Sequence, residues 1–246
     1  MINDFSEGFV KCGHAMLYYR SYGDGVPLIM LHGNMQSAKL FHKQLVFFTD
    51  TCRVITIDSR GHGKSSHGKK RLSINLMAED IITVMNELGI EKAAFIGFSD
   101  GANIALKIAC HHPHNVLAMI LIGANTKADG LKSFIRIPAK IGYAFLRCFS
   151  FFSFFNRMAQ KLSLIVNSPN ISQDHLDAIR IPSLFIAGSR DVIKEEHTKH
   201  IAEQVSSSKL YIVKDGGHNL LKQKPDEINE VMKKFLQDVF SNRKND

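Results

Sequence analysis

The sequence predicts an α/β fold in which helices cover both faces of a mostly parallel sheet. Short apolar, strand-like runs alternate with helical stretches along most of the 246 residues, a pattern typical of parallel strands joined by helical crossovers. Hydrophobic residues make up 45% of the chain, enough to bury a substantial core in one or two domains.

Eight strands are expected. Residues 8–22 have the pattern of an opening antiparallel hairpin that turns near Gly13. The later strand-like runs lie at 27–32, 52–58, 93–98, 116–123, 182–188 and 208–213. The helical stretches lie near 37–48, 74–88, 100–111, 194–205 and 225–240. Pro182 fits the start of its strand, where a missing backbone N–H is tolerated.

The most informative stretch is the strand-to-helix junction at residues 95–101. An apolar run enters the G-x-S-x-G pentapeptide Gly97-Phe98-Ser99-Asp100-Gly101 and continues as a helix. Two flanking glycines let the strand and the helix approach closely, and the sharp turn exposes the serine hydroxyl. Ser99 is therefore a candidate nucleophile, although a serine between glycines is also a common turn residue.

A serine nucleophile needs a base and an acid, and both follow in the chain. His218 and Asp191 each come just after a short apolar run. An imidazole can accept the serine proton, and a carboxylate can fix the tautomer of that imidazole. Asp191 could instead cap the helix that begins near residue 194. Asp215 is the nearest competitor for the acid, but a turn role suits it because it is so close to His218.

Two further loops complete the pattern. The strand at 27–32 breaks at His32-Gly33, and Asp58-Ser59-Arg60-Gly61-His62-Gly63-Lys64-Ser65 fits D-x-R-G-x-G-x-S. Together the five motifs resemble the α/β-hydrolase superfamily, in its branch of esterases and C–C hydrolases, over about residues 10–125 and 180–240. The resemblance implies that the backbone N–H groups of Asn34 and Asp100 form an oxyanion hole. For His32 we expect a structural role, with its ring bonded to the loop backbone.

The resemblance also implies the reaction. It predicts a serine hydrolase that cleaves a small-molecule carboxylic ester with Ser99, Asp191 and His218, without a cofactor or a metal. The Ser-Asp-Gly turn and the later Ile122-Gly123-Ala124-Asn125 are similar to those of aminoacyl-ester hydrolases related to C–C hydrolases, so cleavage of aminoacyl esters or of C–C bonds is also compatible with these motifs. So is a non-hydrolytic, ligand-binding member of the fold, because fold does not determine function. If the Asp100 carboxylate faces the pocket, it would favour cationic acyl groups.

Residues 125–178 interrupt the alternation of strands and helices. We expect a core domain at 1–124 and 179–246, with 125–178 as a small helical cap. This segment holds seven of the 17 phenylalanines. An apolar stripe with helical spacing includes Phe145, Phe149 and Phe152. These rings could pack the cap onto the core, line a lipophilic substrate pocket together with Met35, or enter a membrane surface.

Charge is concentrated in the same segment. Residues 125–161 hold seven lysines and arginines against Asp129 alone, so a net +6 of the chain's +8 lies there. Basic side chains beside aromatic ones suit contact with a membrane surface, the steering of an acidic substrate, or solubility alone. No nucleic acid partner is expected, because no recognised binding module accompanies the basic residues. The oligomeric state does not follow from these patterns.

Two further patterns do not support a nucleotide-binding site or a metal site. Gly63-Lys64-Ser65 resembles the end of a P-loop, but the leading glycine would fall at Asp58. The histidines near 111–114 and 197–200 lack a metal-binding framework.

The four cysteines lack a C-x-x-C spacing and are expected to be reduced. With no secretory signal and no long apolar run, the cytoplasm is the expected location.

Overall fold

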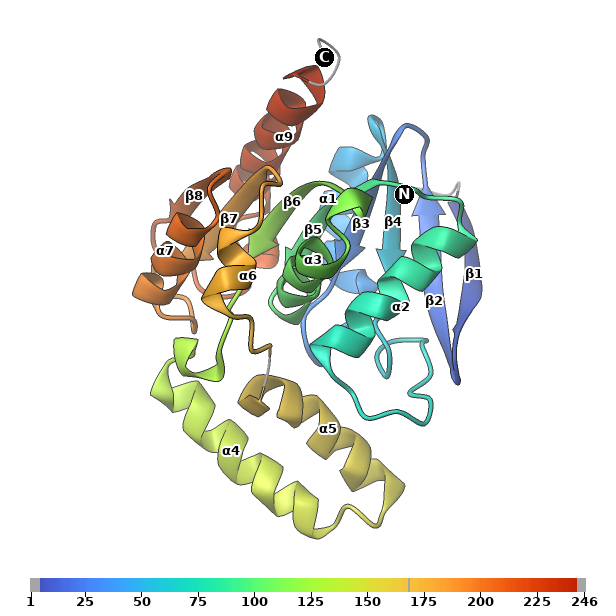
Figure 1. The fold of residues 1–246 in the computed structure, drawn as a ribbon, viewed down its shortest axis with the longest axis vertical. Helices are drawn as coiled ribbons and strands as arrows, with labels where there is room; N and C mark the ends of the chain where they lie inside the picture. The colour runs from blue at the N-terminus through green and yellow to red at the C-terminus, as the bar shows by residue number, and fades with distance from the viewer. Residues whose placement is uncertain (1–4, 168, 243–246) are drawn as a thin grey trace.

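The computed structural model describes residues 5–167 and 169–242, and it contains one eight-stranded sheet (Figure 1). The sheet order is β1-β2-β4-β3-β5-β6-β7-β8. The strands are β1 (Phe5–Cys12), β2 (Ala15–Tyr22), β3 (Val26–Leu31), β4 (Cys52–Ile57), β5 (Ala93–Phe98), β6 (Val116–Ile122), β7 (Ser183–Gly188) and β8 (Ser208–Val213). Among these described strands, only the pairs β1–β2 and β2–β4 are antiparallel. The predicted fold class is therefore confirmed.

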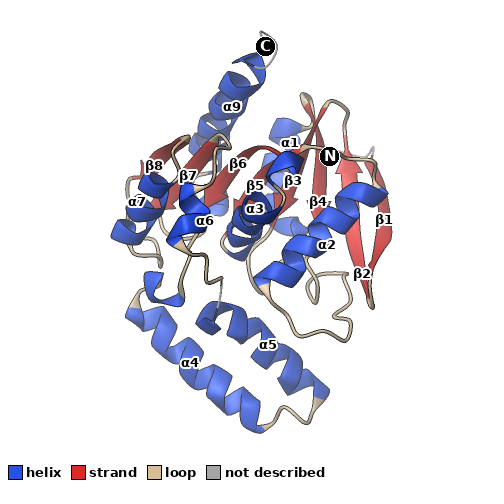
Figure 2. Cartoon of the chain, in the orientation of Figure 1, coloured by secondary structure: helices blue, strands red, loops and turns tan. Residues whose placement is uncertain are grey.

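Helices cover both faces of the sheet (Figure 2). The longer ones are α1 (His42–Phe48), α2 (Ile74–Glu87), α3 (Asp100–His111), α7 (Glu195–Gln204) and α9 (Pro225–Asn242). The short ones are α6 (Gln173–Asp177) and α8 (Leu220–Gln223), with 3₁₀ turns η1 (Ala38–Phe41), η2 (Pro113–Asn115) and η3 (Ala128–Gly130). The sequence did not indicate α6 and α8, because four or five residues are too few to establish a helical period.

Two hydrophobic clusters sandwich the sheet. In β3, Ile29 and Leu31 join the cluster of α2, α3, α6 and α7, whereas Leu28 and Met30 join that of α1, α8 and α9. This division follows from the strand period of two, which sends successive side chains to opposite faces. Because both faces are covered, the central strands are continuous apolar runs, as in β5 with every residue buried.

The parallel strands end in register at one edge of the sheet. Leu31 of β3 pairs with Gly97, Phe98 of β5 pairs with Ile122, and Gly188 of β7 pairs with Val213. The loops that follow these strands therefore meet in one place, where ligands bind in open α/β sheets. The opening hairpin lies at the far edge of the sheet and turns at Gly13, which has φ +62°.

Two long helices lie outside the sheet layers, between β6 and β7. The helices α4 (Ser133–Cys148) and α5 (Ser153–Asn167) form an antiparallel hairpin that projects away from the sheet (Figure 1). The helix α6, in the same insertion, packs instead beside α7 on the core. Among the helices that the structure describes, none is long and apolar enough to cross a membrane.

Candidate active site

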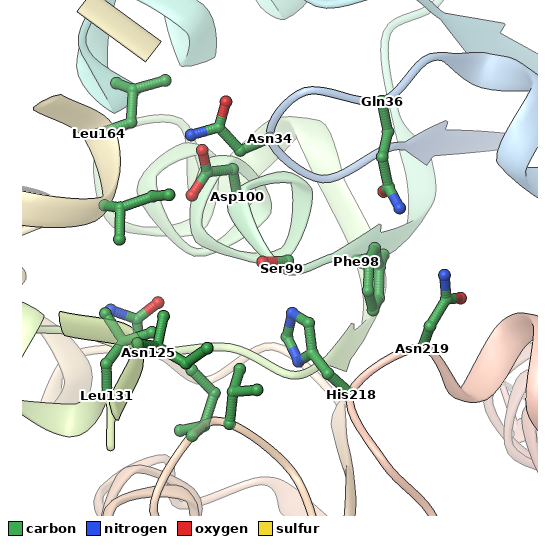
Figure 3. A pocket seen from close by; sticks show the side chains of 14 residues that line it. Asn34, Gln36, Phe98, Ser99, Asp100, Asn125, Leu131, Leu164, His218 and Asn219 are labelled. Atoms are coloured by element: carbon green, nitrogen blue, oxygen red, sulfur yellow. The ribbon is translucent and has the colours of Figure 1, made fainter. Parts of the chain in front are cut away.

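Ser99 occupies a strained turn between β5 and α3. Its backbone has φ 54° and ψ −118°, a conformation that non-glycine residues rarely adopt. Its carbonyl accepts the N–H groups of Ala102 and Asn103, while its own N–H donates to Ile122 on β6. The turn is thus held from both sides, and Ser99 lines a pocket together with His218 (Figure 3).

The two glycines of the pentapeptide are required by close backbone packing. A Cβ on Gly101 would lie 1.9 Å from the carbonyl oxygen of Leu31 at the end of β3. A Cβ on Gly97 would lie 2.5 Å from the Cα of Ala102 in α3. Contacts this short cannot be relieved by moving a side chain, so strand, turn and helix depend on both glycines.

The structure brings Asp191 and His218 together. Nδ1 of His218 lies 2.7 Å from Oδ1 of Asp191, whose carboxylate also accepts the N–H of Ile193. Burial opposes ionisation of this carboxyl, but its hydrogen bonds and the nearby His218 outweigh burial and hold the pKa of Asp191 below its usual range. With Nδ1–H donating to the carboxylate, Nε2 of a neutral His218 ring is left to accept a proton.

Two contacts that the sequence did not indicate fix the ring of His218. Its centroid lies 4.9 Å from that of Phe98, which directly precedes Ser99. A Cβ on Gly123 would lie 2.8 Å from Cε1 of the ring, so the end of β6 packs closely on the imidazole. Gly123 has φ +62°, another reason for glycine at this position.

Asp215 lies outside this arrangement. It sits in a turn with φ 57°, and its exposed carboxylate accepts a hydrogen bond from Arg190 at 2.6 Å. The structure therefore places Asp191, and not Asp215, against His218. Asp191 does not cap α7 either, because Lys194 is the N-cap of that helix.

The two predicted oxyanion donors flank Ser99. Asp100 is the first residue of α3, where backbone N–H groups have no acceptor within the helix. Asn34 follows the end of β3, and both residues line the pocket beside Ser99. The side-chain amide of Asn34 donates to the carbonyl of Lys161 in α5 at 2.8 Å, which ties this loop to the α4–α5 hairpin.

His32 and His62 both contact the same loop, and Nε2 of His62 lies 3.3 Å from Oδ1 of Asn34. Nδ1 of His32 lies 2.7 Å from the carbonyl of Gly33, and Nε2 accepts the N–H of Ser59 at 3.0 Å. Burial lowers the pKa of both rings, to about 3 for His62, so both are neutral at pH 7. These bonds agree with the structural role expected for His32.

The Asp100 side chain also lies at the pocket, beside Asn34 (Figure 3). It is buried, and its Oδ2 has no hydrogen-bond partner among the described residues. Burial raises the pKa of this carboxyl to about 7, while the proximity of His218 lowers it. Asp100 is also the only carboxylate among the described residues that line the pocket.

The pocket has a volume of about 270 Å³, and one of its walls is apolar. That wall is formed by Leu131, Ile135, Leu164, Ile165, Val192 and Ile193. Asn125, beside it, exchanges two hydrogen bonds of 3.0 Å with Asn103 of α3. None of these residues was predicted to line the pocket, although Asn125, Val192 and Ile193 follow strand ends, which is a usable signal.

The structure does not bring the four predicted pocket residues to this pocket. Met35 is 47% exposed, and its neighbours Asn34 and Gln36 line the pocket instead. Phe145, Phe149 and Phe152 are also exposed, near the far end of the α4–α5 hairpin. Only the first turn of α4 reaches the pocket, through Ile135; Phe145 lies ten residues further along, about 15 Å at the rise of an α-helix.

Neither a metal centre nor a disulfide accompanies this site in the described ranges. No three histidine, cysteine or acidic residues of those ranges are grouped to hold a metal ion. All four cysteines are free thiols, two of them buried.

Comparison with known proteins agrees with this architecture. The family model of the alpha/beta hydrolase fold matches residues 26–174, more than half of the chain. Serine hydrolase BPHL of Homo sapiens is 26% identical, over 93% of this chain and 85% of the human protein. AB hydrolase superfamily protein YisY of Bacillus subtilis is 24% identical, over 90% of this chain and 96% of its own.

A solved structure extends the likeness to three dimensions. Est816, described as an N-acyl homoserine lactone degrading enzyme, superposes with a TM-score of 0.76 and 26% identity. The superposition covers 93% of this chain and 100% of Est816. By its family match and its architecture, this chain belongs to the alpha/beta hydrolase fold family.

Proposed function

We propose that this chain is a serine hydrolase that cleaves carboxylic esters through an acyl-enzyme formed on Ser99. The observation that carries the proposal is the 2.7 Å hydrogen bond between His218 and Asp191, beside a pocket that Ser99 also lines. A serine at φ 54° is costly to maintain, and such strain is concentrated at functional sites. The likeness to a human serine hydrolase and to a lactone-degrading enzyme supports the same chemistry.

In the first half of the reaction, the Ser99 hydroxyl attacks the ester carbonyl carbon and gives its proton to Nε2 of His218. Asp191 stabilises the resulting imidazolium and keeps the ring in its orientation. The backbone N–H groups of Asn34 and Asp100 stabilise the oxyanion, and the positive end of α3 adds to this. The intermediate then collapses, and the alcohol leaves with the proton from His218.

In the second half, water attacks the acyl group on Ser99 and gives a proton to His218. The ester bond to Ser99 breaks, its oxygen regains the proton, and the carboxylic acid is released. No redox change occurs, and every proton passes through His218.

The pocket size favours small acyl groups. A volume of about 270 Å³ lies just below the range of roughly 300–1,000 Å³ typical of pockets for drug-sized ligands. The wall of leucine, isoleucine and valine side chains suits a short aliphatic or compact aromatic acyl chain. A series of p-nitrophenyl esters from acetate to palmitate tests this, and we expect kcat/KM to peak at short chains and fall beyond them.

A second candidate is an aminoacyl-ester hydrolase, which the position of Asp100 favours. A carboxylate in a partly desolvated pocket attracts a cationic acyl group more strongly than the same charge in water. The test compares kcat/KM for an α-amino ester and its uncharged isostere, in the wild type and in Asp100→Asn. A preference for the amino ester that disappears in the variant supports this candidate, whereas an unchanged ratio excludes it.

Turnover measurements also distinguish an esterase from a C–C hydrolase and from a non-hydrolytic binding protein. A C–C hydrolase would cleave a vinylogous diketone far faster than any ester of similar size. A non-hydrolytic member of the fold would bind esters without turning them over.

A further inference from the structure

The outer face of the α4–α5 hairpin is apolar and uncovered. Phe134, Ile137, Ile141 and Phe145 recur every three or four residues along α4, and each is between 53% and 66% exposed. A second face of α4 packs on α5, where Ala139 is buried and Gly142 lies against Leu162. The helix therefore has two apolar faces, and only one of them has a partner among the described residues.

The end of the hairpin carries a cluster of phenylalanine rings, here called the aromatic tip. Neighbouring rings of the tip have centroids 4.3 to 6.1 Å apart, so they form one continuous patch. The members are Phe145, Phe149, Phe151, Phe152, Phe154 and Phe155. Phe151 is 76% exposed and Phe154 is 67% exposed. A soluble monomer rarely exposes such a patch unless it contacts something.

Core packing and substrate binding do not account for these rings. They do not pack the cap onto the core, because five of the six are exposed. They do not line the pocket beside Ser99, which reaches α4 only at Ile135. Phe149 is fourteen residues beyond Ile135, about 21 Å along the helix.

A cationic hollow lies next to the aromatic tip. This basic pocket has a volume of about 250 Å³ and is lined by Lys69, Arg71 and Arg147, together with the polar residues Tyr143, Ser150 and Asn156. Arg71 and Arg147 both donate to the hydroxyl of Tyr143, at 2.9 and 3.3 Å. Across residues 5–167 and 169–242, no carboxylate forms an ion pair with any of the three cations.

We propose that the aromatic tip docks on an anionic lipid membrane, with the phenylalanine rings entering the interface and the basic pocket receiving a lipid phosphate. Exposed rings beside unpaired lysine and arginine side chains are the features of an interfacial helix. Charge also decides between a membrane and a second copy of the chain. Two such surfaces would each bring the three cations of the basic pocket, Lys69, Arg71 and Arg147, so they would repel each other, whereas an anionic bilayer complements them. The inference does not depend on the proposed hydrolase activity.

The test is sedimentation with vesicles. The full chain is mixed with vesicles of phosphatidylcholine alone or of phosphatidylcholine with phosphatidylglycerol, at about 0.05 M and 0.5 M salt, concentrations that span strong and weak screening. We expect binding to the anionic vesicles at low salt and a marked loss of binding at high salt. Equal binding to both vesicle types, or to neither, would overturn the proposal.

Variants assign the binding to residues. Lys69→Gln with Arg147→Gln should lower the partition coefficient about 30-fold, since each cation near an anionic surface contributes about fivefold. Phe151→Ser with Phe154→Ser should lower it about tenfold or more, because two partly inserted rings are lost. The matched controls are the double variant Lys11→Gln with Lys43→Gln and the single variant Phe9→Ser. These substitutions change exposed side chains on β1 and α1, and both control variants should bind the vesicles as the wild type does. Melting temperatures confirm that each variant is folded.

A spectroscopic arm uses the absence of tryptophan from the chain. Phe151→Trp places a single reporter in the aromatic tip, and Phe9→Trp places one on β1, at the edge of the sheet and outside the α4–α5 hairpin. We expect a blue shift on adding anionic vesicles for Trp at position 151 only. If neither reporter shifts, or if sedimentation velocity finds a dimer that Phe151→Ser with Phe154→Ser abolishes, the tip is not a membrane contact.

Discussion

Asp191 and His218 are 27 residues apart in the sequence, yet Oδ1 of the first lies 2.7 Å from Nδ1 of the second. They follow β7 and β8, which are adjacent parallel strands whose last residues, Gly188 and Val213, are paired. Two short loops therefore suffice to bring the carboxylate to the imidazole. The side chain of Asp191 is 1% exposed and that of His218 is 24% exposed, so the acid is sealed and the ring remains accessible.

The first prediction concerns the identity of the acid. Asp191→Asn should lower kcat about 10³- to 10⁴-fold with little change in KM, because a wrong imidazole tautomer damages the transition state more than substrate binding. Asp215→Asn removes a carboxylate close to His218 in sequence that pairs with Arg190, and it should change kcat less than about threefold. Steady-state kinetics on a short ester measure both. The reverse order of effects would contradict the assignment.

The second prediction concerns cooperation between Ser99 and His218. Ser99→Ala and His218→Ala should each remove about 10⁴-fold or more of kcat, and the double variant should be little worse than either, because the two groups act in one step. Thermal unfolding should show that Ser99→Ala stays folded. Losses that multiply in the double variant would point to a base other than His218.

The third prediction concerns the backbone packing around the turn. Gly101→Ala should destabilise the fold by about 3 kcal/mol or more, because the new Cβ would meet the Leu31 carbonyl at 1.9 Å. Gly142→Ala is the control, since it lies in α4 with 3.3 Å to a flexible leucine end, and there alanine should be neutral or gain up to about 1 kcal/mol. Urea unfolding compares the two. Similar stability of both variants would show that the close contact is not needed.

The fourth prediction concerns Asp100 and pH. Burial raises the pKa of this carboxyl to about 7, so the folded protein holds the proton more tightly than the unfolded chain. As pH rises from about 4 to 7, the unfolded chain ionises first and the protein loses stability. Asp100→Asn lacks this loss, so the melting temperature of the variant relative to that of the wild type should rise by about 6–13 °C between pH 4.5 and pH 8. A pH-independent difference would mean that the carboxyl is not buried in solution.

The fold could be predicted from the sequence because the alternation of strand-like and helical stretches and the five motifs in their order indicated the same architecture. The strands β5 and β8 and the helix α3 begin and end at the predicted residues, because each is bounded by turn residues. The positions of Ser99, Asp191 and His218 after strand ends were also apparent, because parallel strands end at one edge of the sheet.

The residues that line the pocket were harder to predict from the sequence, and the reason is physical. A helical stripe such as that of Phe145 and Phe149 indicates an apolar face, but it does not say what covers that face. α4 has two such faces, and only packing against α5 distinguishes them. The contacts of Asn125 with Asn103, and of Gly123 with His218, join residues far apart in sequence, and nothing in their spacing shows that they touch.

The most direct test of the proposed mechanism is labelling with a fluorophosphonate, followed by intact mass measurement and peptide mapping. An activated serine attacks the phosphorus and expels fluoride, whereas an unactivated serine does not react. We expect one adduct per chain, located on Ser99, with labelling lost in Ser99→Ala and strongly slowed in His218→Ala. A chain that remains unlabelled, or an adduct on a serine other than Ser99, would contradict the proposal that Ser99 is the nucleophile activated by His218.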